Sequence, residues 1–318
     1  MRKLTTAFSL LAEGSFAVFF RQIRINARRR QLDRAKGRPF TYCTDLFPFV
    51  CVPGLPDSED AFVSPELDRT ELALLCDWLE PGDTFFDVGA NLGLYTFCAA
   101  HRLGRGSAVL AIEASPVLAK AIRACADVLG LDSIYVEQVA AGDAIKEVVF
   151  FSSPSGASTA EQSLNPDPRR AVNYVTQSVH MTTLVEIADR HASAKSPAAI
   201  KVDVEGAEPM ALRGAPRAWF EPNGPMWIVE MNLSALTRSG SKPEDITAHF
   251  PSNSFACWLV PHFPYHGGCE LPMRPMQDHE TFEDSTFYNF IAIPRSAEWS
   301  ARHRHIQRHF SAPIFIHP

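Results

Sequence analysis

Apolar positions along the chain alternate between short continuous runs and stripes with helical spacing. The runs predict strands at 84–88, 108–113, 134–139, 147–151, 199–204, 226–231, 255–260 and 287–293. The stripes predict helices at 93–102, 116–129, 182–191, 206–213 and 243–249. The early strands are apolar almost throughout, as expected where helices cover both faces of a sheet. This alternation predicts an α/β fold with a doubly wound, mostly parallel sheet.

Two of the predicted strands end in an acidic residue that is followed by a glycine turn. The first segment, 85–96, has the sequence FFDVGANLGLYT, and the second, 200–208, has the sequence IKVDVEGAE. Ligands of open α/β sheets bind just beyond the carboxyl ends of the strands. Both strand ends are therefore predicted to lie at a ligand site.

The N-terminal part of the chain differs from the rest in charge. Residues 1–40 carry ten Lys or Arg against two acidic residues, whereas the remainder carries 20 against 34. Residues 5–35 are predicted to form one or two helices, apolar first and then rich in arginine. Such a segment can contact an anionic membrane surface or a partner, or it can pack on the domain with a solvated basic face. We divide the chain into an N-terminal extension (1–62), an α/β domain (63–296) and a C-terminal tail (297–318).

Composition narrows the classes of function. The acidic body of the chain, within a net charge of −6, makes nucleic acid a poor candidate for the main substrate. Seven cysteines without a CxxC spacing suit a reducing compartment. No apolar run is long enough to span a membrane, and Glu13 interrupts the N-terminal apolar stretch, which argues against a signal peptide. These features predict a cytoplasmic protein and leave peripheral contact with the inner membrane surface open.

The first strand end has the features of a nucleoside site. Gly89 and Gly93 permit a sharp turn and a close approach of a ligand to the backbone. Glu113, twenty residues after Gly93, can accept hydrogen bonds from both hydroxyls of a ribose. A dinucleotide site would need a glycine where Asn91 stands, and Asp87 would repel a pyrophosphate. The pattern favours a cationic nucleoside ligand such as S-adenosylmethionine, although the glycines could also serve only a tight turn.

A third strand end adds one residue to this site. Asp143 follows the predicted strand 134–139 within the sequence Ala141-Gly142-Asp143. Because the carboxyl ends of parallel strands meet at one edge of the sheet, we expect Asp143 to border the adenine or its pocket.

The second strand end is rich in groups that can move protons. Asp203 and Glu205 could act as a general base, bind a metal or orient a substrate hydroxyl, and Lys201 could pair with a carboxylate or donate to substrate. Acidic residues at a helix start also cap its N–H groups, and one acidic residue of this run is expected to do only that. Glu230 and Asn232 end the next strand and are predicted to face the same crevice. Asp203, Glu230 and Asn232 could ligate Mg²⁺ or Ca²⁺, or instead hydrogen-bond to substrate.

These motifs, in this order, resemble the FkbM family of methyltransferases over about residues 65–295. The resemblance rests on DVGANLGLYT, Glu113-Ala-Ser-Pro116, Thr182-Thr183-Leu184, KVDVEGAE with Leu212-Arg213-Gly214, and Glu230-Met231-Asn232. It implies a class I (Rossmann-like) fold with a seven-stranded sheet, and residues 63–296 as an S-adenosylmethionine-dependent methyltransferase domain. It also implies methyl transfer to a hydroxyl oxygen of a sugar, glycolipid or secondary metabolite.

The resemblance also assigns residues to the two sides of the reaction. The cofactor would be held by Asp87, Gly89, Ala90, Asn91, Gly93, Tyr95, Thr96 and Glu113. The reacting hydroxyl would lie near Asp203, Glu205, Glu208 and Glu230, with Asp203 as the first candidate for the base and Glu230 as the second. The chain departs from the family at Ala124 and Asp127, where asparagines are common. Acceptor specificity is expected to vary in 152–181, a segment without clear periodicity.

Two other functions fit part of the pattern. A nicotinamide-dependent oxidoreductase shares the glycine turn and the ribose acid, and titration with both cofactors would separate the two enzymes. A non-catalytic binding module could keep the fold and dock through its basic N-terminal helix. The complete acidic set at the two strand ends argues against that second alternative.

Overall fold

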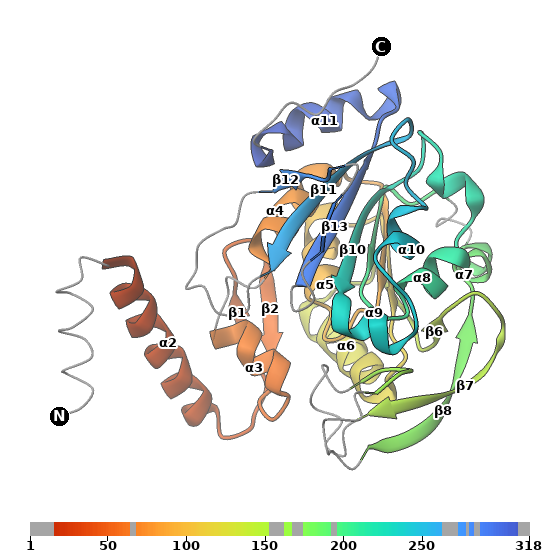
Figure 1. The fold of residues 1–318 in the computed structure, drawn as a ribbon. Helices are drawn as coiled ribbons and strands as arrows, with labels where there is room; N and C mark the ends of the chain where they lie inside the picture. The colour runs from red at the N-terminus through yellow and green to blue at the C-terminus, as the bar shows by residue number, and fades with distance from the viewer. Residues whose placement is uncertain are drawn as a thin grey trace.

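A computed structural model describes residues 16–63, 68–152, 162–166, 174–191, 196–262, 273–277, 280–282 and 287–310. Its centre is an eight-stranded sheet with the order β12-β11-β13-β10-β9-β3-β4-β5 (Figure 1). Five adjacent strands are parallel: β10 (Met226–Asn232), β9 (Ala199–Val202), β3 (Thr84–Val88), β4 (Ala108–Ile112) and β5 (Ile134–Glu137). The other three are antiparallel to their neighbours: β13 (Phe287–Pro294), β11 (Phe255–His262) and β12 (Arg274–Pro275).

The sheet confirms the predicted doubly wound, mostly parallel architecture. Its seven longer strands are the seven expected, and β12 adds an eighth of two residues at the edge. From β3 the chain builds β4 and β5 on one side, and it returns as β9 and β10 on the other. The carboxyl ends of β3 and β9 therefore border the crevice where folds of this kind bind ligands.

Helices cover both faces of the sheet (Figure 1). One apolar core joins the sheet to α4 (Arg69–Trp78), α5 (Leu94–Leu103), α6 (Pro116–Leu129) and α11 (Ser300–Ile306). The opposite core includes α7 (Leu184–Arg190), α8 (Glu208–Arg213), η3 (Arg217–Phe220), α9 (Leu233–Arg238) and α10 (Glu244–Thr247). Every residue of β3, β4 and β9 is buried, which explains their continuous apolar runs. Helix α9 was not predicted, because it has only six residues and starts directly at the end of β10.

A smaller sheet stands beside the main one. β7 (Lys146–Ser152) pairs antiparallel with β8 (Val175–Thr182), and β8 pairs parallel with β6 (Ala140–Ala141). The strand predicted at 147–151 is therefore one half of a hairpin with β8. Ser163 forms a bridge with Phe151 of β7, and its hydroxyl donates to the carbonyl of Glu205. The hairpin is thus connected to the turn that follows β9.

The first helix of the described N-terminal extension packs on the rest of that extension. The described extension comprises α2 (Phe16–Ala35), β1 (Phe40–Cys43), β2 (Pro48–Cys51) and α3 (Pro56–Val63). Ile25 packs with Phe62, and the Arg28 guanidinium donates to the Phe62 carbonyl and lies 5.3 Å from the centre of its ring. Residues 1–15 of the predicted helical segment lie outside the described residues. The domain boundaries at 62 and 296 stay predictions.

The C-terminal segment also packs on the domain. η4 (Ala297–Trp299), α11 and η5 (Gln307–His309) follow β13, and Arg302 forms an ion pair with Asp83. None of the described helices combines the length and apolar character needed to cross a membrane.

The two acidic strand ends touch through their backbones. The Asp203 amide donates to the Val88 carbonyl at 2.9 Å, which places the end of β9 against the end of β3. Gly89 has a φ of +78°, and a Cβ at this position would overlap the carbonyl oxygen of Asp203. Only glycine allows this contact.

This contact predicts unequal costs for two glycine substitutions. Gly89→Ala and Gly130→Ala both place a side chain at positive φ, which costs roughly 1–2 kcal/mol. Gly130 has no atom within 4 Å of the new Cβ, whereas Gly89 would meet Asp203. Gly89→Ala should therefore lose about 1–3 kcal/mol more in the free energy of unfolding, because overpacking adds to the strain. Urea denaturation of both variants measures this difference, and equal losses would contradict the steric role of Gly89.

Candidate active site

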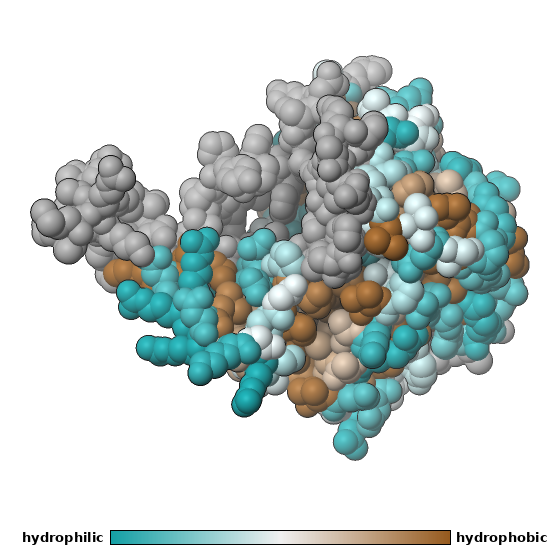
Figure 2. Space-filling model, turned by 90° about the horizontal axis from the view of Figure 1, so that it is seen from below, coloured by the Kyte–Doolittle hydropathy of each residue, from teal (hydrophilic) through white to brown (hydrophobic). Residues whose placement is uncertain are grey.

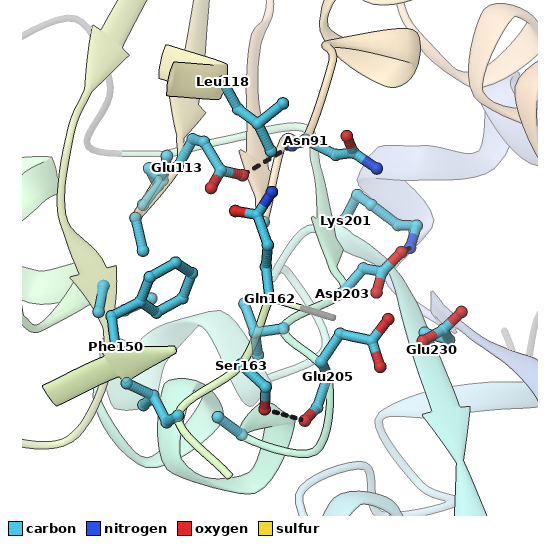
Figure 3. A pocket seen from close by; sticks show the side chains of 18 of the residues that line it. Asn91, Glu113, Leu118, Phe150, Gln162, Ser163, Lys201, Asp203, Glu205 and Glu230 are labelled. Atoms are coloured by element: carbon cyan, nitrogen blue, oxygen red, sulfur yellow. Dashed lines mark hydrogen bonds and ion pairs between the residues drawn. The ribbon is translucent and has the colours of Figure 1, made fainter. Parts of the chain in front are cut away.

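A cavity of about 290 Å³ lies beyond the carboxyl ends of β3, β4, β9 and β10. In Figure 3, Glu113, Leu118 and Phe150 stand at one end of it, and four charged residues from β9, β10 and the turn after β9 gather at the other. Its polar lining consists of Asp68, Asn91, Glu113, Gln162, Ser163, Lys201, Asp203, Glu205, Glu230, Tyr288 and Asn289. The cavity joins the two strand ends that the sequence singled out.

The Glu113 end of the cavity is built to accept hydrogen bonds. The carboxylate accepts from the backbone N–H of Asn91 at 2.8 Å and from that of Ser115 at 2.7 Å. A carboxylate has about four acceptor sites, so these two bonds fix its orientation and leave others for a ligand. Burial raises the pKa of Glu113 to about 7, and the nearby charges of Asp87 and Asp203 act in the same direction. The apolar neighbours Leu118 and Phe150 form a wall beside it (Figure 3).

The glycine turn lies between the two ends. Asn91 has a φ of +55°, and its Oδ1 is buried without a hydrogen-bond partner among the described residues. Asp87 is buried below the turn and accepts a hydrogen bond from Thr96 at 2.5 Å. Burial raises the pKa of Asp87 to about 6. Asp87 and Tyr95 line a smaller cavity that shares Asn91 with the first, whereas Thr96 lines neither and acts through Asp87.

Lys201 and Asp203 form a buried ion pair at the acidic end. The Lys201 ammonium donates to Asp203 Oδ2 at 3.0 Å and lies 5.1 Å from the centre of the Tyr95 ring. Burial alone would lower the pKa of Lys201, but the negative charge of Asp203 and its hydrogen bond to the ammonium act against burial, and the pKa is raised. The Asp203 side chain remains 34% exposed, so its carboxylate is accessible from the cavity.

Glu230 differs from Asp203 in its surroundings. Burial raises the pKa of Glu230 well above its usual value, and the charges of Asp203 and Glu205 raise it further. Its Oε2 is buried and has no hydrogen-bond partner within the described part of the chain. The site therefore combines a carboxylate paired with a cation and a carboxyl group whose surroundings favour its protonated form.

The other polar residues of these two strand ends mainly hold the backbone in place. The Glu208 carboxylate accepts from the backbone N–H groups of Val204 and Gly206, so it holds the turn before α8 and does not cap the helix itself. Asn232 caps α9 by accepting from the Ala235 N–H, while its amide donates to Glu205 at 3.4 Å.

The predicted metal set does not fit this arrangement. Side-chain oxygens of Asp203, Glu208 and Glu230 lie within 4.8 Å of one another, a set that shares Asp203 and Glu230 with the predicted one. The Lys201 ammonium already pairs with Asp203, and backbone N–H groups occupy the Glu208 carboxylate. We assign no step of the chemistry to a metal.

Two groups of residues differ from the sequence expectation. Asp143 does not line the cavity; its carboxylate accepts two hydrogen bonds from the Arg213 guanidinium, and Val139, Ala140 and Ala141 line the wall instead. Five lining residues with polar side chains were not predicted: Asp68, Gln162, Ser163, Tyr288 and Asn289. For Asn289 the missing information was the strand order, because β13 inserts next to β10 and brings Asn289 opposite Glu230.

Comparison with known proteins agrees with this geometry. A search of curated proteins found no match. Two similar solved structures are an O-methyltransferase from Bacillus cereus in complex with SAH (10% identity, TM-score 0.36, covering 85% of this chain and 90% of that one) and an rRNA methylase from Streptococcus thermophilus (10%, 0.37, 70% and 94%). A family model, in contrast, shows the class of protein, the S-adenosylmethionine-dependent methyltransferases with a class I fold. The model of the FkbM methyltransferase domain matches residues 87–257, more than half of the sequence and both strand-end motifs, and the chain therefore belongs to this family.

Proposed function

We propose that this methyltransferase transfers the methyl group of S-adenosylmethionine to a hydroxyl oxygen of a sugar, glycolipid or secondary metabolite. One observation carries the proposal: a single cavity connects the hydrogen-bond-accepting Glu113 end with the acidic end at Asp203 and Glu230. Family membership favours methyl transfer over nicotinamide-dependent oxidation. The acidic end favours an acceptor that brings hydrogen-bond donors.

The residues at the Glu113 end fit S-adenosylmethionine. The free acceptor sites of Glu113 would receive the ribose hydroxyls, and Leu118 and Phe150 would flank the adenine. The unpartnered Oδ1 of Asn91 offers a further acceptor beside the turn. When bound, the cofactor supplies a methyl group that its positively charged sulfur already activates. The carboxylates around the cavity suit a ligand of that charge.

The acidic end would handle the proton of the acceptor hydroxyl. An acceptor oxygen must be held in line with the methyl group at about 3 Å and must lose its proton during transfer. Asp203 suits the base because the Lys201 ammonium stabilises its carboxylate as an anion and because it remains accessible. The surroundings of Glu230 favour its protonated form, so it would orient the hydroxyl rather than accept its proton.

We also propose that α2 brings the enzyme to anionic membrane surfaces. Ile25 and Arg28 attach the helix to Phe62 of α3, and Arg29, Arg30 and Arg34 are exposed. Figure 2 shows hydrophilic side chains gathered at the end of the molecule that carries α2. Charge complementarity supports an anionic lipid surface as the partner. An enzyme that methylates glycolipids would meet its acceptor there.

The assigned base predicts a selective loss of catalysis. Asp203→Ala should lower methyl transfer by on the order of 10²–10⁴ while the affinity for S-adenosylhomocysteine stays nearly unchanged. Calorimetry measures the affinity, and incorporation of tritiated methyl groups into carbohydrate and lipid extracts measures the activity. Asp143→Ala, which removes a carboxylate outside the cavity lining, is the control. Full activity of Asp203→Ala would remove Asp203 from the chemistry.

The raised pKa of Glu113 predicts pH-dependent cofactor binding. Ribose hydroxyls that donate to Glu113 favour its ionised form, so binding must release the proton that Glu113 holds below about pH 7. Affinity for S-adenosylhomocysteine should therefore fall about tenfold between pH 8 and pH 6. Calorimetry across this range measures the effect, and Glu113→Gln should bind weakly with a flatter profile. A flat profile for the unsubstituted protein would contradict the assignment.

The membrane proposal predicts a charge-dependent interaction with vesicles. Each Arg near an anionic surface contributes about 1 kcal/mol, so replacing Arg29, Arg30 and Arg34 with Glu should weaken binding at least about a hundredfold. Co-sedimentation with phosphatidylcholine vesicles, with and without phosphatidylserine, measures this. The control carries the same charge change at three exposed arginines elsewhere: Arg105, Arg217 and Arg304. An equal loss in the control, or no binding at all, would overturn the proposal.

A further inference from the structure

Asn289 presents an unused hydrogen-bond acceptor to the cavity. It lies on β13, is 5% exposed and belongs to the cavity lining. Its Nδ2 donates to Glu71 Oε1 at 2.7 Å, and Glu71 on α4 is itself only 2% exposed. This bond fixes the amide, because only the nitrogen can donate to the carboxylate. Within the described part of the chain, Asn289 Oδ1 has no hydrogen-bond partner.

A buried hydrogen-bond acceptor without a partner destabilises the folded protein, and a ligand that donates to it removes this destabilisation. Most buried polar atoms in folded proteins have a partner. Glu71 and Asn289 are 218 positions apart and connect α4 with β13. The pair thus holds one amide oxygen at the cavity rather than completing a local turn or cap.

Glu230 lies directly beside this acceptor. Glu230 and Asn289 are register partners on the antiparallel strands β10 and β13, and opposite residues of such a pair project from the same face of the sheet. Both line the cavity, and Glu230 Oε2 is likewise buried without a partner among the described residues. Two unsatisfied oxygen sites on neighbouring strands can receive two neighbouring groups of one ligand.

The charge around this pair selects the type of ligand. Lys201 is the one cationic residue among the described residues that line the cavity, and it already pairs with Asp203. Carboxylates of Asp68 and Glu205 also line the cavity, so a ligand with a phosphate or carboxylate here would meet repulsion. A hydroxyl group can both donate and accept, which suits an amide oxygen next to a carboxyl group.

We propose that Asn289 Oδ1 and the Glu230 carboxyl group together bind two neighbouring hydroxyl groups of an uncharged acceptor, as on a sugar ring. Glu71 is a positioning residue that turns the Asn289 oxygen toward the cavity. The inference rests on the proposed methyl transfer to a hydroxyl and adds the groups that select the acceptor. The competing ligand for the same oxygens is the ammonium group of the cofactor.

Measurements of cofactor affinity and of acceptor methylation distinguish these two alternatives. Asn289→Ala should leave the affinity for S-adenosylhomocysteine within about twofold while lowering incorporation of tritiated methyl groups into extracts about tenfold or more. Anion-exchange separation should place the label of the unsubstituted enzyme in the uncharged fraction. Glu71→Ala should lower incorporation similarly, and Glu71→Gln should restore most of it because its amide oxygen can still accept from Asn289.

A second variant distinguishes a loss of acceptor binding from a loss of folding. The double substitution Glu71→Leu and Asn289→Leu replaces both partners with apolar groups of similar size, which is often nearly neutral for stability. It also removes the amide oxygen and should lose incorporation as Asn289→Ala does. Unchanged melting temperature and cofactor affinity of the double variant show that the fold and the nucleoside end remain intact.

Three results would overturn the inference, each in a different way. Unchanged incorporation by Asn289→Ala, or label in the anionic fraction, would remove Asn289 from acceptor binding. A loss of affinity for S-adenosylhomocysteine but not for methylthioadenosine, which lacks the amino acid part, would assign Asn289 to the cofactor ammonium. An unsubstituted enzyme that binds S-adenosylhomocysteine but labels no extract would overturn the proposed function together with this subsite.

Discussion

The site depends on the backbone contact between Gly89 and Asp203, which no residue with a side chain would permit. The same turn is attached to β4, because the N–H groups of Gly89 and Ala90 both donate to the Ile112 carbonyl. Glu113 follows Ile112 directly, so three strand ends are held together. The glycine of the first motif therefore brings the ribose acid and the proposed base to one cavity.

Several acidic side chains can share this small cavity because the cost of burying each negative charge is offset in a different way. Burying an unpaired charge costs several kcal/mol, so Asp203 pairs with Lys201, whereas Glu113 accepts two backbone N–H groups. Glu208 is held by the backbone of the turn, and the surroundings of Glu230 favour its protonated form. These differences in compensation separate the roles that the sequence alone left equivalent. Asp203 remains as the accessible anion next to the cavity.

The features that could be predicted from the sequence are those that depend on neighbouring residues along the chain. Strands buried on both faces have continuous apolar runs, so β3, β4 and β9 were found at nearly their observed bounds. Which acidic residue holds the turn depended on backbone direction after Val202, where Glu205 and Gly206 both have positive φ. Asp143 was misplaced because its partner, Arg213, lies 70 positions away. Asn289 required the strand order as well as its distant partner Glu71.

The two ends of the cavity are built from different parts of the fold. The residues at one end can therefore change without affecting what binds at the other. Backbone groups at the ends of β3 and β4 hold Glu113 in place, so the nucleoside end can change little without disturbing the central sheet. The acceptor end also draws on β13 and on Ser163, which the β7–β8 hairpin positions from outside that sheet. Changes in the hairpin or at Asn289 can therefore alter the acceptor while the cofactor site remains the same. With the proposed assignment of the two ends, that division would let one scaffold keep its methyl donor while the acceptor changes.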